Sequence, residues 1–230
     1  MADFNIEKEL QKQDYKYIAG VDEAGRGPLA GPVVAAAVIL PLTDVADNNL
    51  FDEINDSKQT KEKKRYELFD VITDNATAYS ISEINNNTID EINILNATMK
   101  AMENAVCNLK IQPDYLLIDG NRYCSPVIPF RTIIKGDSIC KSISAASILA
   151  KVYRDKFMIE IADKEFPQYN FAKHKGYGTK EHIELIKKHG ICKYHRLSFL
   201  NKILHSKTAL FFCLIITFHN VINIFLFLLT

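Results

Sequence analysis

The chain has 230 residues, with 28 Lys and Arg balanced by 28 Asp and Glu, so its formal net charge is zero. This length suffices for one sizeable α/β domain, and 47% hydrophobic with 24% charged residues excludes a disordered chain. The five cysteines contain no C-x-x-C pair, which argues against a zinc site or a disulfide framework. Residues 1–16 are mostly polar and do not resemble a secretory signal, so we expect a cytoplasmic protein.

Charge is distributed unevenly along the chain. Residues 1–56 hold 11 acidic and 4 basic side chains, whereas residues 170–207 hold 9 Lys and Arg against two glutamates. A basic C-terminal portion is typical of proteins that contact a phosphate backbone. The alternative is that several of these lysines only form the solvated face of a helix.

The first half of the chain alternates between strand and helix patterns. Apolar runs predict three strands, at 18–22, 33–40 and 77–84. Apolar residues at spacings of three and four predict helices over 57–73 and 88–109. Thr88 is placed to cap the second of these helices, with Glu91 completing a capping box.

The second half continues the alternation. Strands are predicted at 115–119 and 130–135, and helices over 138–165 and 179–188. The small residues of Ser144–Ser147 allow the third helix to lie close on the sheet. These elements predict an α/β fold with a mixed five-stranded sheet flanked by helices, plus a helical C-terminal portion. We expect one catalytic domain over residues 1–200.

Two adjacent carboxylates, Asp22 and Glu23, end the first predicted strand and are surrounded by glycines. Burying them side by side is costly, because each disfavours the ionised form of the other and both lose water. A divalent cation would remove that cost, and glycine lets a ligand approach the backbone closely. The alternative is an exposed turn in which both carboxylates are solvated.

Two further carboxylates follow later strands. Asp119 ends the run Tyr115–Ile118, and Asp137 comes shortly after the predicted strand at 130–135. In sheets flanked by helices, strand ends are where sites form. Asp-Gly is also an ordinary turn signal, but three strands that each deliver a carboxylate favour a shared site.

Six segments are long and chemically unusual. They read GVDEAGRGPLAGPV at 20–33, DSK at 56–58, LLIDGNR at 116–122, KGDS at 135–138, SAASILAKVYRD at 144–155 and HKGYGTKEH at 174–182. In this order they resemble bacterial type 2 ribonuclease H, ribonuclease HII, and the resemblance runs from about residue 17 to residue 199. It implies a ribonuclease H-like fold. It also implies an endoribonuclease that hydrolyses the RNA strand of RNA–DNA hybrids and nicks DNA 5′ to embedded ribonucleotides.

The resemblance implies that Asp22, Glu23, Asp119 and Asp137 are catalytic and bind metal. Mg²⁺ and Mn²⁺ are hard cations that take carboxylate oxygens, and two of them can promote phosphodiester hydrolysis. Asp22 is then the natural bridge between the two ions. The expected products carry a 5′-phosphate and a 3′-hydroxyl, as those of the family do.

Substrate contacts follow from the same resemblance. The 2′-hydroxyl separates RNA from DNA, and the backbone of Gly25, Arg26 and Gly27 is placed to contact it beside the carboxylates. Tyr177 would stack on the neighbouring sugar, and Lys58 would contact phosphate. The glycines alternatively serve only to make a turn. We expect His174 and His182 to be solvated.

Asp155 is a further acid in a family-like motif. On a single helix over 138–160 it would lie roughly 25 Å along the axis from Asp137. It therefore should not share a metal with Asp137, and a partner such as Lys151 or Arg154 is expected instead.

The resemblance stops after Phe199. Residues 209–230 read ALFFCLIITFHNVINIFLFLLT, an uncharged segment long enough to span a bilayer. Three interpretations of residues 201–230 stay open: a tail anchor that tethers the enzyme to a membrane, a buried terminal helix, or an altered reading frame.

Two classes of function therefore compete. One is a metal-dependent endonuclease, which we expect to act as a monomer. The other is a non-catalytic nucleic-acid-binding or membrane-tethered protein on the same scaffold. Another nuclease with a ribonuclease H-like fold, such as a resolvase or integrase, is a weaker rival because the GRG and HKGY elements have no role there.

Overall fold

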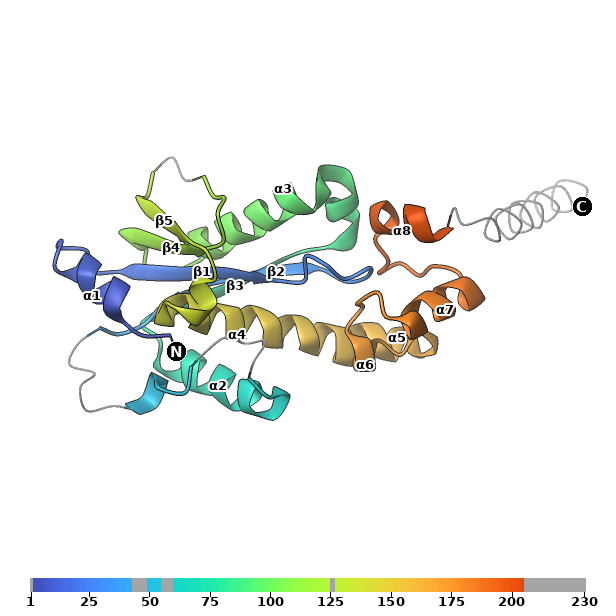
Figure 1. Ribbon diagram of the computed structural model, residues 1–230, viewed down its shortest axis with the longest axis horizontal. Coiled ribbons are helices and arrows are strands. Elements are labelled where there is room, and N and C mark those ends of the chain that lie inside the picture. The colour runs from blue at the N-terminus through green and yellow to red at the C-terminus, as the bar shows by residue number, and fades with distance from the viewer. Residues whose placement is uncertain (1, 43–48, 55–59, 125–126, 205–230) are drawn as a thin grey trace, which may run out of the picture.

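The computed structural model describes residues 2–42, 49–54, 60–124 and 127–204, and its centre is a five-stranded sheet (Figure 1). The strands are β1 (Ile18–Ala24), β2 (Val33–Ile39), β3 (Ala78–Ile84), β4 (Tyr115–Asp119) and β5 (Phe130–Ile133). Their order is β3-β2-β1-β4-β5. β2 pairs antiparallel with β1 and β3, whereas β4 pairs parallel with β1 and β5. The predicted mixed five-stranded α/β fold is confirmed.

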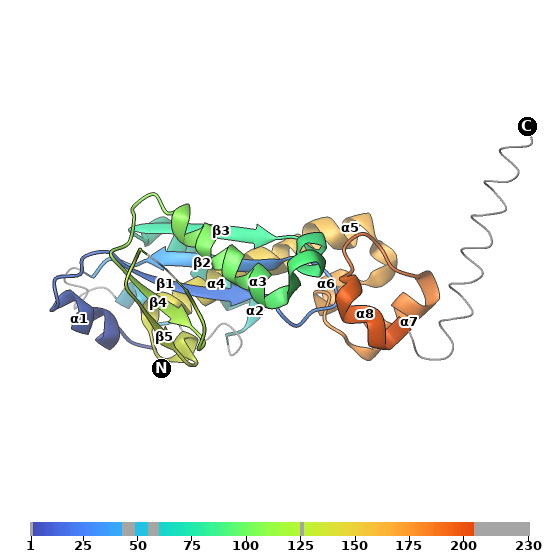
Figure 2. The same cartoon turned by 90° about the horizontal axis from the view of Figure 1, so that it is seen from above.

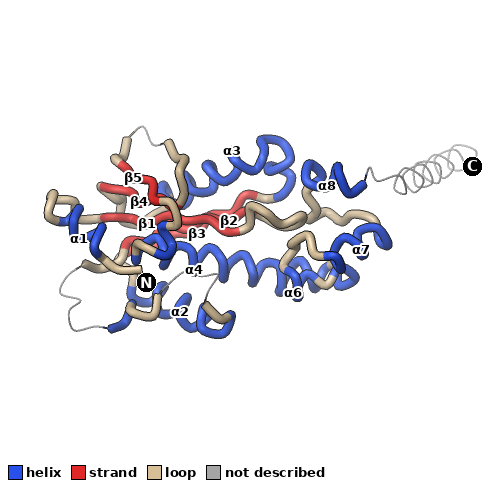
Figure 3. Tube along the Cα trace, in the orientation of Figure 1, coloured by secondary structure: helices blue, strands red, loops and turns tan. Residues whose placement is uncertain are grey.

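Helices cover both faces of this sheet, as Figure 3 shows by colour. α3 (Asn86–Cys107) lies on one face, and α4 (Lys141–Lys156) lies on the other beside α2 (Glu62–Asn75). The remaining α-helices are α1 (Asn5–Gln11), α5 (Asp163–Glu165), α6 (Phe171–His174), α7 (Lys180–His189) and α8 (Leu197–Leu204). Short helical turns occupy Asn49–Phe51, Gly136–Ser138, Phe157–Ala162 and Pro167–Tyr169. α5 to α8 gather beyond one end of the sheet (Figure 2).

β2 is buried on both faces and divides the core into two layers. Val33, Ala35 and Ala37 pack with α3, whereas Val34 and Ala36 pack with α2 and α4. Successive strand residues point to opposite faces, so a continuous apolar run is what a doubly covered strand requires.

α4 lies very close to β1. A Cβ built on Gly20 would lie 2.1 Å from the carbonyl carbon of Ser142, so only glycine allows the helix backbone to pack there. Ser144–Ser147 are all buried in this contact, as their small size predicts. The close packing brings α4 over the end of β1 that carries Asp22.

Several predicted boundaries are wrong. α3 begins at Asn86, and Asn85 is its cap because the Asn85 side chain accepts a hydrogen bond from the Thr88 amide at 2.9 Å. Thr88 is therefore inside the helix. α2 begins at Glu62 because Lys61 has an extended backbone. The predicted 138–165 helix is a short turn followed by α4 and a π-helical segment.

The C-terminal helices form a small core of their own, which includes Tyr169, Phe171 and Leu200. Three histidines lie against it. His174 and His182 are 7% and 0% exposed, and His195 is 2% exposed, so the expectation that His174 and His182 are solvated is wrong. Their hydrogen bonds run within the protein, because segments 174–182 and 192–196 fold against each other.

The start of the domain expected over residues 1–200 lies outside the described residues, whereas its expected end is described. α8 spans residue 200, and Leu200 is fully buried. None of the described helices is both long and apolar enough to cross a membrane. Residues 209–230 lie outside the described residues, so the tether and its two alternatives stay predictions.

The buried histidines predict acid-sensitive stability. Burial lowers the pKa of His182 and of His195 from 6.5 to about 4. As pH falls from 6.5 toward 4, protons bind the unfolded chain before the folded one, so this contribution is complete above pH 6.5 and is lost toward pH 4. The difference in free energy of unfolding between wild type and His182→Gln, measured in urea at several pH values, should shrink with acidification.

The exposed His189 supplies a matched control for that measurement. The free energy of unfolding of His189→Gln, which replaces a histidine on the surface, is measured at the same pH values for comparison. If the difference in free energy of unfolding between wild type and His182→Gln is constant between pH 7 and pH 4.5, the predicted effect of the buried histidines is wrong. The carboxylates contribute equally to both proteins, so their contribution cancels in this difference.

Candidate active site

The parallel pairing of β1 and β4 places two carboxylates side by side. The register pairs Gly20 with Leu117 and Val21 with Ile118, so the next residues along the two strands are Asp22 and Asp119. Gly20 packs against the start of α4, and Asp22 follows two residues later on the same face. Strand register alone therefore brings together acids that are separated by almost half of the chain.

Asp22, Glu23 and Asp119 form one cluster. Each offers a carboxylate oxygen, and these oxygens all lie within 4.8 Å of one another. Burial raises the pKa of Asp22 well above its usual value, and the charges of Glu23 and Asp119 raise it further. Hydrogen bonds from the Glu23 amide, at 2.6 Å, and from the Ser147 side chain act in the opposite direction.

This cluster fits a hard divalent cation. Asp22 is 3% exposed, while Glu23 and Asp119 are half-buried, so a cation could reach the three oxygens from the open side. Mg²⁺ and Mn²⁺ prefer oxygen ligands of this kind and need no histidine. A bound cation would also offset the repulsion that raises the pKa of Asp22.

Asp137 lies near the cluster but is not a member of it. β5 ends at Ile133, Lys135 takes a left-handed conformation with φ of 57°, and Asp137 is buried in the following turn. The amide of its neighbour Gly136 donates a hydrogen bond of 2.7 Å to Asp119 Oδ1. Among the described residues, the cluster that could hold a metal ion consists of Asp22, Glu23 and Asp119. A metal-binding role for Asp137 therefore stays a prediction.

The loop that follows β1 lies directly beside Glu23. Gly25 is buried and has a φ of 95°, a conformation that side chains disfavour, and a Cβ there would lie 2.2 Å from Arg154 Nε. Arg26 and Gly27 are exposed. The Arg26 guanidinium reaches back to Glu23, with NH1 3.3 Å from Oε1. The Gly25–Gly27 segment is thus a tight turn next to the acidic cluster, and two of its residues, Arg26 and Gly27, are exposed.

Tyr177 lies across from this turn. It is 42% exposed, and a Cβ built on Gly27 would lie 4.0 Å from its Cε1 atom. Lys151 Nζ and Arg154 Cζ lie 5.7 and 5.8 Å from its ring centroid. The structure therefore brings Gly27 and Tyr177 together although 150 positions separate them, and it places cations against the ring.

Asp155 is separate from the cluster, as expected. Its Oδ1 accepts a hydrogen bond of 2.7 Å from Lys151, one turn earlier on α4, and Oδ2 lies 3.9 Å from Arg65. Its predicted pairing with Lys151 is confirmed, whereas the Arg154 guanidinium donates to backbone carbonyls. Lys58 lies outside the described residues, and its phosphate contact stays a prediction.

Sequence reasoning missed the buried arginines around the turn. Arg154 and Arg196 are both 0% exposed, and their guanidinium groups reach the loop between β1 and β2. One sequence signal exists for Arg154, which stands in the segment 144–155 that resembles the family. Nothing in spacing or periodicity indicates which backbone atoms they contact.

The acidic cluster predicts that metal binding depends on Asp22 and not on Asp155. Asp22→Asn removes the most buried charge among the three ligands and should abolish Mn²⁺ binding measured by calorimetry. Asp155→Asn is the matched control, because Asp155 is also buried and carries the same substitution. Equal loss of binding in the two folded variants would contradict this division of the acids.

Comparisons with known proteins agree on one family. The family model described as Ribonuclease HII matches residues 19–202. A ribonuclease HII of Caldicellulosiruptor bescii is 52% identical over 87% of this chain and 95% of its own length. One from Acetivibrio thermocellus is 57% identical over 84% of this chain and 73% of its own length.

Solved structures give the same result. The ribonuclease H2 of Pyrococcus horikoshii is 27% identical, with a TM-score of 0.67 over 82% of this chain and 97% of that one. This likeness fits the ribonuclease H-like fold expected from the sequence. The chain belongs to the ribonuclease HII family and is a metal-dependent nuclease.

Proposed function

We propose that this protein hydrolyses the RNA strand of RNA–DNA hybrids and nicks DNA 5′ to embedded ribonucleotides. The products would carry 5′-phosphate and 3′-hydroxyl ends. The observation that carries the proposal is the position of the Gly25–Gly27 turn, which lies between the acidic cluster on one side and Tyr177 on the other. We further propose that the protein acts as a monomer in the cytoplasm.

The acidic cluster is proposed to hold two Mn²⁺ or Mg²⁺ ions. Bound ions of this kind supply an activated water, neutralise phosphate charge and stabilise the leaving oxygen. Asp22, at the centre of the cluster, would contact both ions, with Glu23 and Asp119 on its flanks. Asp137 is proposed as the fourth carboxylate. The residue before it, Gly136, donates its amide hydrogen bond to Asp119, so Asp137 follows directly after a residue that contacts the cluster.

Selectivity is proposed to come from the turn and from Tyr177. Arg26 and Gly27 are exposed, and a backbone that includes glycine lets a ribose approach closely. The 2′-hydroxyl is the group that separates RNA from DNA at one nucleotide. The exposed face of Tyr177 would stack on the adjoining sugar. Lys151 Nζ lies 5.7 Å from the centroid of the same ring, and we propose that its charge attracts a backbone phosphate.

The direct experiment uses a DNA duplex with one ribonucleotide, labelled at its 5′ end, with Mn²⁺, with Mg²⁺ or with EDTA. We expect a single nick 5′ to the ribonucleotide in either metal. A polymerase should extend the 3′-hydroxyl at that nick, and a phosphatase should remove the 5′-phosphate. The same duplex without the ribonucleotide is the control. Cleavage of both duplexes, or of neither while an RNA–DNA hybrid is cut, would contradict the proposed ribonucleotide selectivity.

Tyr177 predicts a split between two substitutions. Tyr177→Phe keeps the ring face and should retain much of the activity, whereas Tyr177→Ala should lose ~1–3 kcal/mol of transition-state stabilisation, the usual scale of stacking on nucleic acid. Cleavage rates at subsaturating duplex measure this loss. Tyr79→Ala is a matched control, because Tyr79 is 39% exposed but lies on β3. Equal losses for Phe and Ala at position 177 would assign the role to the hydroxyl.

A further inference from the structure

The buried guanidinium of Arg196 is bound to the loop between β1 and β2. It is 0% exposed and donates to three backbone carbonyls: Gly31 O at 2.9 Å, Arg26 O at 3.1 Å and Gly25 O at 2.7 Å. Two of these carbonyls belong to the turn beside the acidic cluster. The planar fork of arginine suits this task, because its donors diverge at fixed angles and can bind several acceptors at once.

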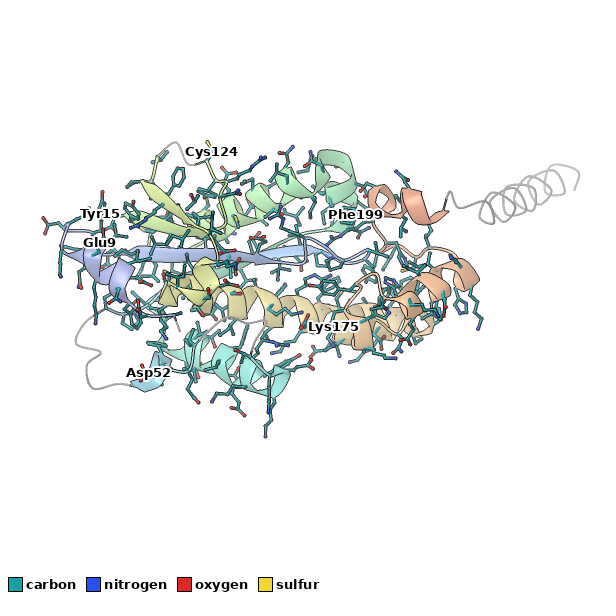
Figure 4. The ribbon with its side chains drawn as sticks, in the orientation of Figure 1. Glu9, Tyr15, Asp52, Cys124, Lys175 and Phe199 are labelled. Carbon is teal, nitrogen blue, oxygen red and sulfur yellow. The ribbon has the colours of Figure 1, made fainter. Side chains whose placement is uncertain are left out.

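Arg154 holds the far end of the same loop. It donates to Ala30 O, Pro32 O and Lys175 O, each at 3.0 Å. Lys175, labelled in Figure 4 beside the C-terminal half of α4, comes two residues before Tyr177. One guanidinium therefore joins the loop to the segment that carries Tyr177. The backbone adds to this link, because Leu29 N donates to Gly176 O at 2.8 Å and Arg196 N donates to Leu29 O at 2.8 Å.

These contacts determine which way the peptide units of the turn point. In a trans peptide the C=O and the following N–H point in opposite directions. The Gly25 and Arg26 carbonyls point inward to Arg196, so the amides of Arg26 and Gly27 point away from it. Both of these residues are exposed. The turn consequently presents two successive N–H donors outward, an arrangement that binds an electron-rich oxygen.

Two buried cations are an expensive way to stabilise a loop. Burial lowers the pKa of Arg154 to about 10 and that of Arg196 to about 9, and the two charges repel each other. Apolar residues of similar volume often provide as much stability as a buried charge does. What apolar residues cannot do is bind carbonyl oxygens and so fix the direction of the peptide units.

We propose that Arg196 is a positioning residue for substrate selection. By binding the carbonyls of Gly25 and Arg26, it directs the amides of Arg26 and Gly27 toward the ribose oxygen and so establishes the preference for a ribonucleotide. Arg154 supports it by holding the loop against the Tyr177 segment. This inference rests on the proposed function, in which the turn contacts the 2′-hydroxyl.

The test compares affinities for two duplexes in Ca²⁺, used to occupy the metal site while cleavage is slow. One duplex contains a single ribonucleotide, and the other has the same sequence in DNA alone. Arg196→Lys keeps the charge but loses the fork. We expect it to reduce the ratio of the two affinities at least about tenfold, the scale of hydrogen bonds to a charged donor, and to leave affinity for the all-DNA duplex nearly unchanged.

Leu200→Ala is the matched control for general destabilisation. Leu200 is fully buried in the same C-terminal core and is not part of the loop. It should lower thermal stability and leave the affinity ratio as in wild type. In Arg196→Ala, added guanidinium at low millimolar concentration should restore part of the ratio, which a purely structural role would not explain.

The outcomes separate this inference from the proposed function. If wild type binds both duplexes equally, the proposed ribonucleotide contact fails before any variant is considered. If wild type prefers the ribonucleotide and Arg196→Lys keeps that preference while folded, the positioning role of Arg196 is overturned. The positioning role would also be overturned if Leu200→Ala lowered the ratio of the two affinities as much as Arg196→Lys does.

Discussion

The site depends on the burial of Asp22 beside two other carboxylates. α4 packs so closely on Gly20 that water is excluded from the face of β1 on which Asp22 lies. Because Asp119 follows in register on the neighbouring parallel strand, the same packing that builds the core also concentrates negative charge. The repulsion between these carboxylates destabilises the fold when no cation is bound, and the same negative charge attracts a divalent cation. Metal affinity and fold stability are therefore opposed at this strand end.

The second part of the site is built differently, from hydrogen bonds across long distances in the sequence. The turn after β1 has no regular secondary structure, and its shape depends on arginines from α4 and from the segment before α8. Tyr177 belongs to the same C-terminal unit, whose histidines hydrogen-bond to each other and to the Tyr177 carbonyl. Consequently, loss of the Arg154 or Arg196 contacts can alter the turn without touching the carboxylates, and the two parts of the site can be tested separately.

Local pattern was sufficient for the sheet and for part of the site. Period-two and continuous apolar runs predicted all five strands, and strand-end logic predicted that Asp22 and Asp119 converge. The same logic predicted Asp137 in the shared site, which stays a prediction, because the pattern could not show that the chain leaves β5 at Ile133 and turns through a left-handed Lys135. Nor could it predict the burial of His182 or the carbonyl contacts of Arg196, since both depend on segments that meet only in the folded chain. Tertiary contacts, unlike periodicity, leave little trace in a single sequence.

The central claim is that Asp22 is retained at a cost in stability because a cation needs it. The most direct measurement is the free energy of unfolding in urea for wild type and Asp22→Asn, each in EDTA and in saturating Mn²⁺. We expect Asp22→Asn to be at least as stable as wild type in EDTA, because the repulsion is relieved. Mn²⁺ should then stabilise only wild type, since a ligand that binds the folded state alone raises its stability. An Asn variant that is weaker in EDTA and gains as much from Mn²⁺ as wild type would contradict the account.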